Sequence, residues 1–306
     1  MSSWQGKTRG GISGYKIFVW TLKHLGLSFA YFLLIFVVTY FVFASRKAVV
    51  QMYSFFRRRL GWGFFRTLGG IWKNYYVFGQ VILDKIAMLA GFQYKFTFDF
   101  EGEEYLRQMD RGGLLISAHM GNWEIAGHLL NRLEKTIHII LFDAEHRQIS
   151  QYLSEVLATR KVDFIVIRDD YSHLEQIRDA FRKGDIIAMH GDRFIEGNKV
   201  MMIDFLGSPA PIPTGPLTLA ARFNVPVSFV FAMKETRTHY HFYGTPLRRL
   251  AYTGNLKKRE EILREALEGY VAEMEKVLAR YPWQWFNYYD FWKVPGRRED
   301  PQKAVA

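Results

Sequence analysis

Residues 114–124 read LLISAHMGNWE, a short and largely apolar run that leads straight into a histidine and a turn containing glycine and asparagine. Runs of this kind are the form that strands take when helices cover both faces of their sheet. Strand-like runs, the first of them alternating, occur at 94–100, 114–118, 137–142, 164–167, 186–189 and 227–232. Helix-like amphipathic stretches lie at 123–133, 146–161, 172–183, 216–223 and 256–280. This alternation predicts an α/β fold with a mostly parallel sheet flanked by helices.

The composition narrows the class of protein. The chain has 306 residues, a formal net charge of +11 and no cysteine. The lack of cysteine excludes disulfide scaffolds, thiolate zinc sites and a cysteine nucleophile. The positive charge favours an anionic partner, which leaves nucleic acid, phosphate-bearing lipids and an acidic protein open.

The segment 25–44, LGLSFAYFLLIFVVTYFVFA, carries no charge over twenty residues. As a helix it would reach about 30 Å, the thickness of the hydrocarbon layer of a bilayer. A signal peptide and a buried core helix are the alternatives, but the run is long for the first and has no polar stripe for the second. We therefore expect two parts: residues 1–44 with a membrane helix, and one continuous catalytic domain at 45–306.

Basic residues interleaved with aromatic ones follow the apolar segment, as in FFRRR at 55–59 and FFR at 64–66. Such a surface fits an anionic membrane, where cations meet lipid phosphates and rings lie at headgroup level. A solvated helix face is the other interpretation. Basic residues flank the segment on both sides, and their small excess after it favours a cytoplasmic catalytic domain. A membrane span and the lack of any nucleic-acid-binding motif argue against nucleic acid as the partner.

His119 and Glu124 lie five positions apart at the turn that follows the predicted strand 114–118. A neutral imidazole can accept a hydroxyl proton, and a carboxylate bonded to its other nitrogen fixes the tautomer. His138 and Asp143 have the same spacing, but they lie along a predicted strand, which would hold them about 17 Å apart. The turn with Gly121 and Asn122 can instead fold Glu124 back towards His119, so only the first pair is a candidate dyad.

The stretch ISAHMGNWEIAG, at 116–127, resembles the H-x4-D/E block of the lysophospholipid acyltransferase superfamily. The HxGNWE form is similar to the branch that holds the late acyltransferases of lipid A biosynthesis and the bacterial mannoside acyltransferases. GDRFIEG at 191–197 and NVPV at 224–227 are similar to later blocks in the same order. YPWQWFNYYDFW at 281–292 resembles the closing P-x-Q-W motif. The resemblance covers roughly residues 20–293 and implies a glycerolipid-acyltransferase-like fold.

This resemblance implies roles for several residues. His119 would be the general base and Glu124 its orienting partner, with backbone N–H groups near Gly121 and Asn122 as donors to the oxyanion. Asn122 could bind substrate or cap a helix. Asp192 and Arg193 are candidate substrate-binding residues: Arg193 could bind a phosphate group, or Asp192 could simply pair with it. The lipid A enzymes carry an arginine after the second strand, where this chain has LFDAEH at 141–146, and Arg147 or Arg168 could take its place.

The expected reaction moves a fatty acyl chain from a thioester to a hydroxyl or amine of a membrane lipid acceptor. Acyl carrier protein, an acidic partner for a basic surface, is the expected donor, and coenzyme A the alternative. Lipid A or another outer-membrane lipid is the expected acceptor, at the inner membrane, and an aminolipid, glycolipid or lipid-conjugated pigment the alternative. No metal or other cofactor is expected. A basic membrane-docking module is the non-enzymatic alternative.

Overall fold

The computed structural model describes residues 12–89, 96–122, 135–142, 162–167, 170, 172–194 and 197–293. Its centre is a seven-stranded sheet in the order β1-β9-β8-β2-β5-β3-β4. The strands are β1 (Thr97–Glu101), β2 (Gly113–Ser117), β3 (Ile137–Phe142), β4 (Val162–Ile167), β5 (Ile186–His190), β8 (Val227–Lys234) and β9 (His239–Gly244). Strands β8, β2, β5, β3 and β4 are parallel. Strand β9 runs antiparallel to β8, and β1 runs parallel to β9.

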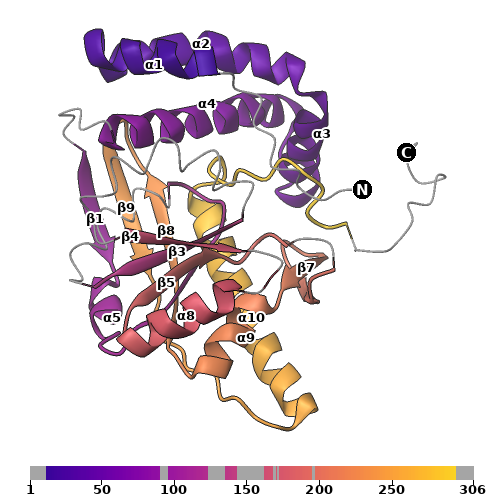
Figure 1. The fold of residues 1–306 in the computed structure, drawn as a ribbon. Coiled ribbons are helices and arrows are strands. Elements are labelled where there is room, and N and C mark those ends of the chain that lie inside the picture. The colour runs from indigo at the N-terminus through magenta and orange to yellow at the C-terminus, as the bar shows by residue number, and fades with distance from the viewer. Residues whose placement is uncertain are drawn as a thin grey trace.

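Helices pack around this sheet (Figure 1). They include α5 (Glu103–Arg107), α8 (Ser172–Lys183), α9 (Gly215–Phe223) and α10 (Leu256–Arg280). The longest of them, α10, starts where the Asn255 side chain accepts a hydrogen bond from the Lys258 N–H, which is a standard N-terminal cap. Eight of its residues are buried, as the amphipathic pattern at 256–280 predicts for a helix packed on a core: Leu263, Ala266, Leu267, Tyr270, Val271, Met274, Val277 and Leu278.

The N-terminal helices form a layer over one edge of the sheet. Helices α1 (Ile12–His24) and α2 (Gly26–Ala44) lie over α4 (Phe64–Leu89), which itself lies across the strand ends (Figure 1). Helices α2 and α4 approach closely at Gly79, where a Cβ atom would lie 2.5 Å from the Leu34 side chain. One face of α2 is thus buried on α4, while its other face exposes the large apolar side chains Phe29, Phe32, Ile35, Phe36, Tyr40 and Phe43.

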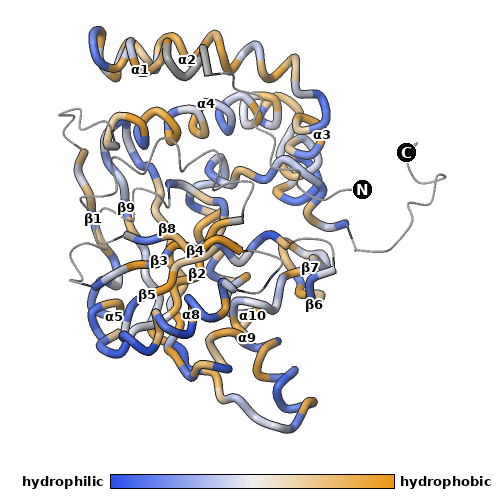
Figure 2. Tube along the Cα trace, viewed as in Figure 1, coloured by the Kyte–Doolittle hydropathy of each residue, from blue (hydrophilic) through white to orange (hydrophobic). Residues whose placement is uncertain are grey.

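Helix α2 is long and apolar enough to cross a membrane. Figure 2 shows hydrophobic residues along most of it. This agrees with the expectation of a membrane helix at 25–44, and the helix ends at Ala44, where the sequence suggests a boundary. The division into residues 1–44 and one catalytic domain at 45–306 stays a prediction.

Two further pieces belong to the described part of the chain. Helix α3 (Arg46–Ser54) continues into a π-helical turn, η1 (Phe55–Arg59), which brings the chain from α2 to α4. Strands β6 (Val200–Asp204) and β7 (Pro209–Pro213) form a separate antiparallel hairpin. The last described residues, 281–293, run without a helix or a strand back to the carboxyl ends of the parallel strands.

The structure confirms the α/β class and each strand expected from an apolar run. Hairpin β6–β7 and strand β9, which lies between β1 and β8, are additions that the apolar runs did not predict. The helices expected at 123–133 and 146–161 lie wholly outside the described residues.

Candidate active site

The candidate site forms where two neighbouring parallel strands end. Strands β2 and β5 pair in a register that places Ser117 beside His190. His119 follows β2 by two residues, and Asp192 follows β5 by two residues. Because the carboxyl ends of parallel strands share one edge of the sheet, these two side chains meet although they are 73 positions apart.

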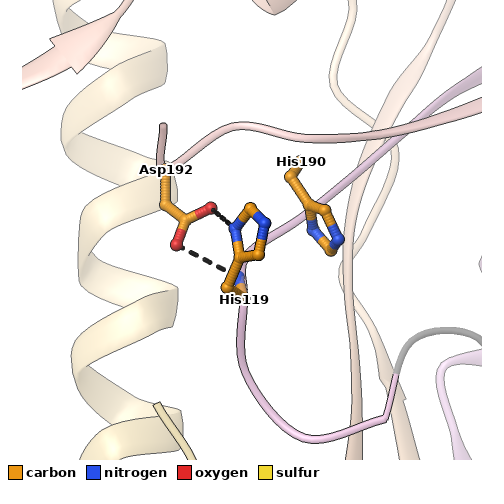
Figure 3. Close-up of side chains that lie close together, drawn as sticks. All are labelled: His119, His190 and Asp192. Atoms are coloured by element: carbon orange, nitrogen blue, oxygen red, sulfur yellow. Dashed lines mark hydrogen bonds and ion pairs between the residues drawn. The ribbon is translucent and has the colours of Figure 1, made fainter. Parts of the chain in front are cut away.

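His119 and Asp192 are joined by two hydrogen bonds (Figure 3). The imidazole Nδ1 lies 2.7 Å from Asp192 Oδ1, and the backbone N–H of His119 donates to Oδ2 over 3.1 Å. The Asp192 side chain is only 2% exposed and that of His119 is 18% exposed. A carboxylate that accepts the Nδ1 proton leaves Nε2 as the basic nitrogen of the ring.

The charges around Asp192 keep it ionised. Burial opposes the charged form, but the charge and hydrogen bonds of His119 outweigh burial and lower the Asp192 pKa, with smaller contributions from Arg193 and His190. An anionic Asp192 can stabilise the imidazolium that forms when His119 accepts a proton.

His190 packs directly against His119. Its ring centroid lies 4.1 Å from that of His119, and both of its ring nitrogens are buried. Burial, together with the charge of His119, lowers the His190 pKa well below its usual value. His190 is therefore a neutral side chain at physiological pH.

The same three residues could also hold a metal ion. One ligand atom each from His119, His190 and Asp192 lies within 4.8 Å of the others. Three protein ligands suit a catalytic metal site. A metal at Nδ1 of His119 would have to replace the hydrogen bond to Asp192 there, whereas acyl transfer by a general base uses that hydrogen bond as it stands.

The closing segment 281–293 holds the site together. Trp285 Nε1 donates to Asp192 Oδ2 over 3.4 Å, and the Phe286 N–H donates to the His119 carbonyl over 2.9 Å. The Trp285 side chain is fully buried among Phe55, Phe205 and Phe291. The P-x-Q-W resemblance pointed to this segment, but not to its contacts with His119 and Asp192.

The turn after His119 is fixed by backbone contacts. Gly121 has a φ of +61°, and a Cβ atom there would lie 2.0 Å from the carbonyl oxygen of Ala232. Its N–H donates to the Gln284 carbonyl over 2.8 Å, and the N–H of Asn122 donates to Ala232 over 2.7 Å. These two N–H groups, expected as oxyanion donors, are instead bonded to strand β8 and the closing segment, so that expectation is wrong for Gly121 and Asn122.

The other candidate residues have different surroundings. Asn122 is 2% exposed, and its side-chain amide donates to the Val81 carbonyl of α4 and to the Tyr240 hydroxyl. Arg193 follows Asp192 at the strand end and donates from Nη2 to the Phe286 carbonyl over 2.9 Å. Glu124 and Arg168 lie outside the described residues, so their predicted roles stay predictions.

A comparison with protein families identifies the chain. The sequence profile described as bacterial lipid A biosynthesis acyltransferase matches residues 71–293, which is well over half of the chain and includes the whole site. The chain belongs to this family. It is an acyltransferase of lipid A biosynthesis, and it transfers an acyl chain to a lipid acceptor. The resemblance inferred from the HxGNWE block is confirmed.

Two further comparisons add little to this assignment. No match was found among curated protein sequences. Among solved structures, the 1-acyl-sn-glycerophosphate (LPA) acyltransferase PlsC from Thermotoga maritima is similar to this lipid A acyltransferase family member, with a TM-score of 0.38 and 12% identity. That match covers 83% of this chain and 97% of the Thermotoga chain.

Proposed function

We propose that His119 is the general base of the acyl transfer and that Asp192 orients it. The observation that carries this proposal is the 2.7 Å contact between His119 Nδ1 and the buried, ionised Asp192. This contact sets the tautomer in which Nε2 accepts a proton. Glu124 belongs to the same family motif, and we retain it as a second proposed catalytic carboxylate.

The reaction then proceeds without a covalent intermediate on the protein. His119 Nε2 takes the proton of the acceptor hydroxyl while the hydroxyl oxygen attacks the thioester carbonyl. The tetrahedral adduct expels the thiolate, and the imidazolium returns its proton to that sulfur. The products are the acylated lipid and a free thiol, and an amine acceptor would give an amide by the same steps.

The orientation of the site supports a substrate that comes from a bilayer. The carboxyl ends of the parallel strands face α4 and the layer of α1 and α2, as the contact from Asn122 to Val81 shows. The outer face of α1 and α2 exposes large apolar side chains, which suit the hydrocarbon layer. We propose that the protein attaches to the inner membrane through this face, with the catalytic domain on the cytoplasmic side.

The donor and the acceptor follow from charge and family. An acyl carrier protein suits the net charge of +11, and coenzyme A is the second candidate. A phosphorylated, lipid A-type acceptor suits a guanidinium next to the site, and we propose Arg193 as its phosphate contact. We also propose Arg168 as a second phosphate contact and Asn122 as a substrate contact. A lipid other than lipid A is the alternative acceptor.

The test compares His119→Ala with His138→Ala in the full-length protein in lipid vesicles. His138 is a matched control, because it also pairs with an aspartate, Asp185 at 3.0 Å, but at the amino ends of the parallel strands. Acyl carrier protein and coenzyme A thioesters are offered with a lipid A precursor or a glycolipid, and products are identified by mass. His119→Ala should abolish transfer while His138→Ala retains it. Turnover by His119→Ala would refute the proposed base.

A further inference from the structure

A buried ion pair connects helix α4 to the end of strand β8. Lys234 Nζ donates to Asp84 Oδ2, and the two side chains are 4% and 0% exposed. Buried charges persist only where further hydrogen bonds satisfy them. The hydroxyl groups of Tyr31 and Tyr240 both donate to the Asp84 carboxylate, and Lys234 also donates to the Arg237 carbonyl over 2.7 Å.

Tyr31 makes the apolar helix α2 a member of this network. Its ring is 2% exposed, and its hydroxyl lies 3.2 Å from Lys234 Nζ. Tyr31 is on the face of α2 that packs against α4, together with Leu27, Leu34 and Val38. The network is therefore complete only when α2 is docked on α4. Tyr31 provides this link, because no other residue of α2 contacts Asp84 or Lys234 through a hydrogen bond in the described part of the chain.

One connection leads from Lys234 to the turn after His119. The Gln284 side-chain amide makes two hydrogen bonds with the backbone of Lys234. The Lys234 N–H donates to Gln284 Oε1 over 2.9 Å, and Gln284 Nε2 donates to the Lys234 carbonyl over 2.7 Å. The Gln284 carbonyl in turn accepts the Gly121 N–H over 2.8 Å. The residue that holds Asp84 thus also holds the segment to which Gly121 is bonded.

A second connection leads through Tyr240. Its hydroxyl donates to Asp84 and accepts from the Asn122 side-chain amide over 3.4 Å. Burial and the charge of Asp84 raise the Tyr240 pKa well above its usual value, so the hydroxyl stays protonated and keeps its role as donor. The two connections reach Gly121 and Asn122, which lie two and three positions after His119.

We propose that the Asp84–Lys234 pair and Tyr240 are positioning residues for the His119 turn, and that Tyr31 makes full turnover depend on the seating of helix α2. Reactive groups must be held within fractions of an ångström for efficient transfer, so a small shift of the turn lowers kcat. The proposal rests on the role of His119 given above. Its consequence is that α2 has a part in catalysis as well as in membrane attachment.

The experiment is a double-mutant cycle on the full-length protein in lipid vesicles. Tyr31→Phe and Tyr240→Phe each remove one hydroxyl and keep the ring. Each should lower kcat by about tenfold, the effect of one lost buried hydrogen bond, with the KM for the thioester unchanged. If both act through Asp84, the double variant should lose little more than the worse single variant, because coupled residues are not additive.

Tyr243→Phe is the matched control. Tyr243 lies on the same strand as Tyr240, but its hydroxyl bonds to Tyr281 at 2.7 Å. It should leave kcat near that of the unmodified protein, and its effect should multiply with that of Tyr31→Phe. Unchanged kcat in Tyr31→Phe and Tyr240→Phe, or effects of these two that multiply, would overturn the proposal.

Hydrogen exchange gives a readout that needs no turnover and no Tyr240 variant. In Tyr31→Phe, the N–H groups of Gly121 and Asn122 should exchange about tenfold faster, because opening of the turn becomes easier. The N–H of Leu114, which donates to Pro226 at the opposite end of β2, should be unaffected. Unchanged exchange at Gly121 would refute the coupling, whereas loss of the His119 role alone would leave the exchange result intact.

Discussion

Replacement of Asp192 by asparagine removes the charge next to His119 and keeps the size of the side chain. The carboxylate contacts Nδ1 of His119 at 2.7 Å and is almost fully buried, so solvent screens the pair little. At an effective dielectric of about 20, unit charges about 4 Å apart attract by about 4 kcal/mol. Asparagine keeps one hydrogen bond but loses this stabilisation of the imidazolium, so we expect kcat to fall by a factor of about 10² to 10³.

The assay is initial-rate acyl transfer by the full-length protein in vesicles, with kcat and KM measured separately. Because Asp192 acts on His119 and contacts no substrate in the proposed mechanism, KM should change little. Asp185→Asn is the matched control, since Asp185 pairs with His138 at the far end of the sheet. A kcat for Asp192→Asn within about threefold of the unmodified protein, or an effect confined to KM, would refute an orienting role.

Two further predictions concern stability. The pKa of His190 is lowered in the folded state, so as the pH falls below about 6.5 a proton binds to this side chain only in the unfolded chain. The stability that the neutral His190 contributes is therefore complete above that pH and declines below it. The Tm of His190→Gln should therefore fall less between pH 7 and 5 than that of the unmodified protein, and an equal fall would contradict the buried neutral state. Gly121→Ala should destabilise the fold by about 3 kcal/mol, from its positive φ and the Ala232 contact, whereas Gly61→Ala, with a φ of +66° and open space, should cost about 1 kcal/mol. Similar Tm shifts in these two variants would show that the contact at Gly121 does not matter.

The sequence correctly predicted those features that depend on neighbouring residues. Apolar runs such as 114–118 and 186–189 mark strands because burial on both faces requires continuous apolar side chains. The stripe along 256–280 marks a helix because the helical period places those residues on one face. His119 was recognised as a candidate because it directly follows such a run, and the HxGNWE motif gave the family.

The carboxylate that contacts His119 depends on the tertiary structure. The predicted dyad used Glu124, which is close in sequence and belongs to the motif, and Asp192 was assigned a substrate contact or a pair with Arg193. In the structure, the buried Asp192 occupies Nδ1. The signal that could have found this contact is that both residues follow strand ends by the same distance, but that requires β2 and β5 to be neighbours.

Helix α2 shows the same division. Its composition predicts a membrane helix, and it is apolar nearly all round, so no pattern along 25–44 indicates which face packs against protein. The close approach at Gly79 and the contacts of Tyr31 with Asp84 and Lys234 decide that face. The sequence by itself determined the elements, the candidate histidine and the family, because these depend on local periodicity and motif. Only the tertiary structure decided that Asp192 holds His119 and that α2 contacts the core, because strand order and helix docking bring together residues that lie far apart in the chain.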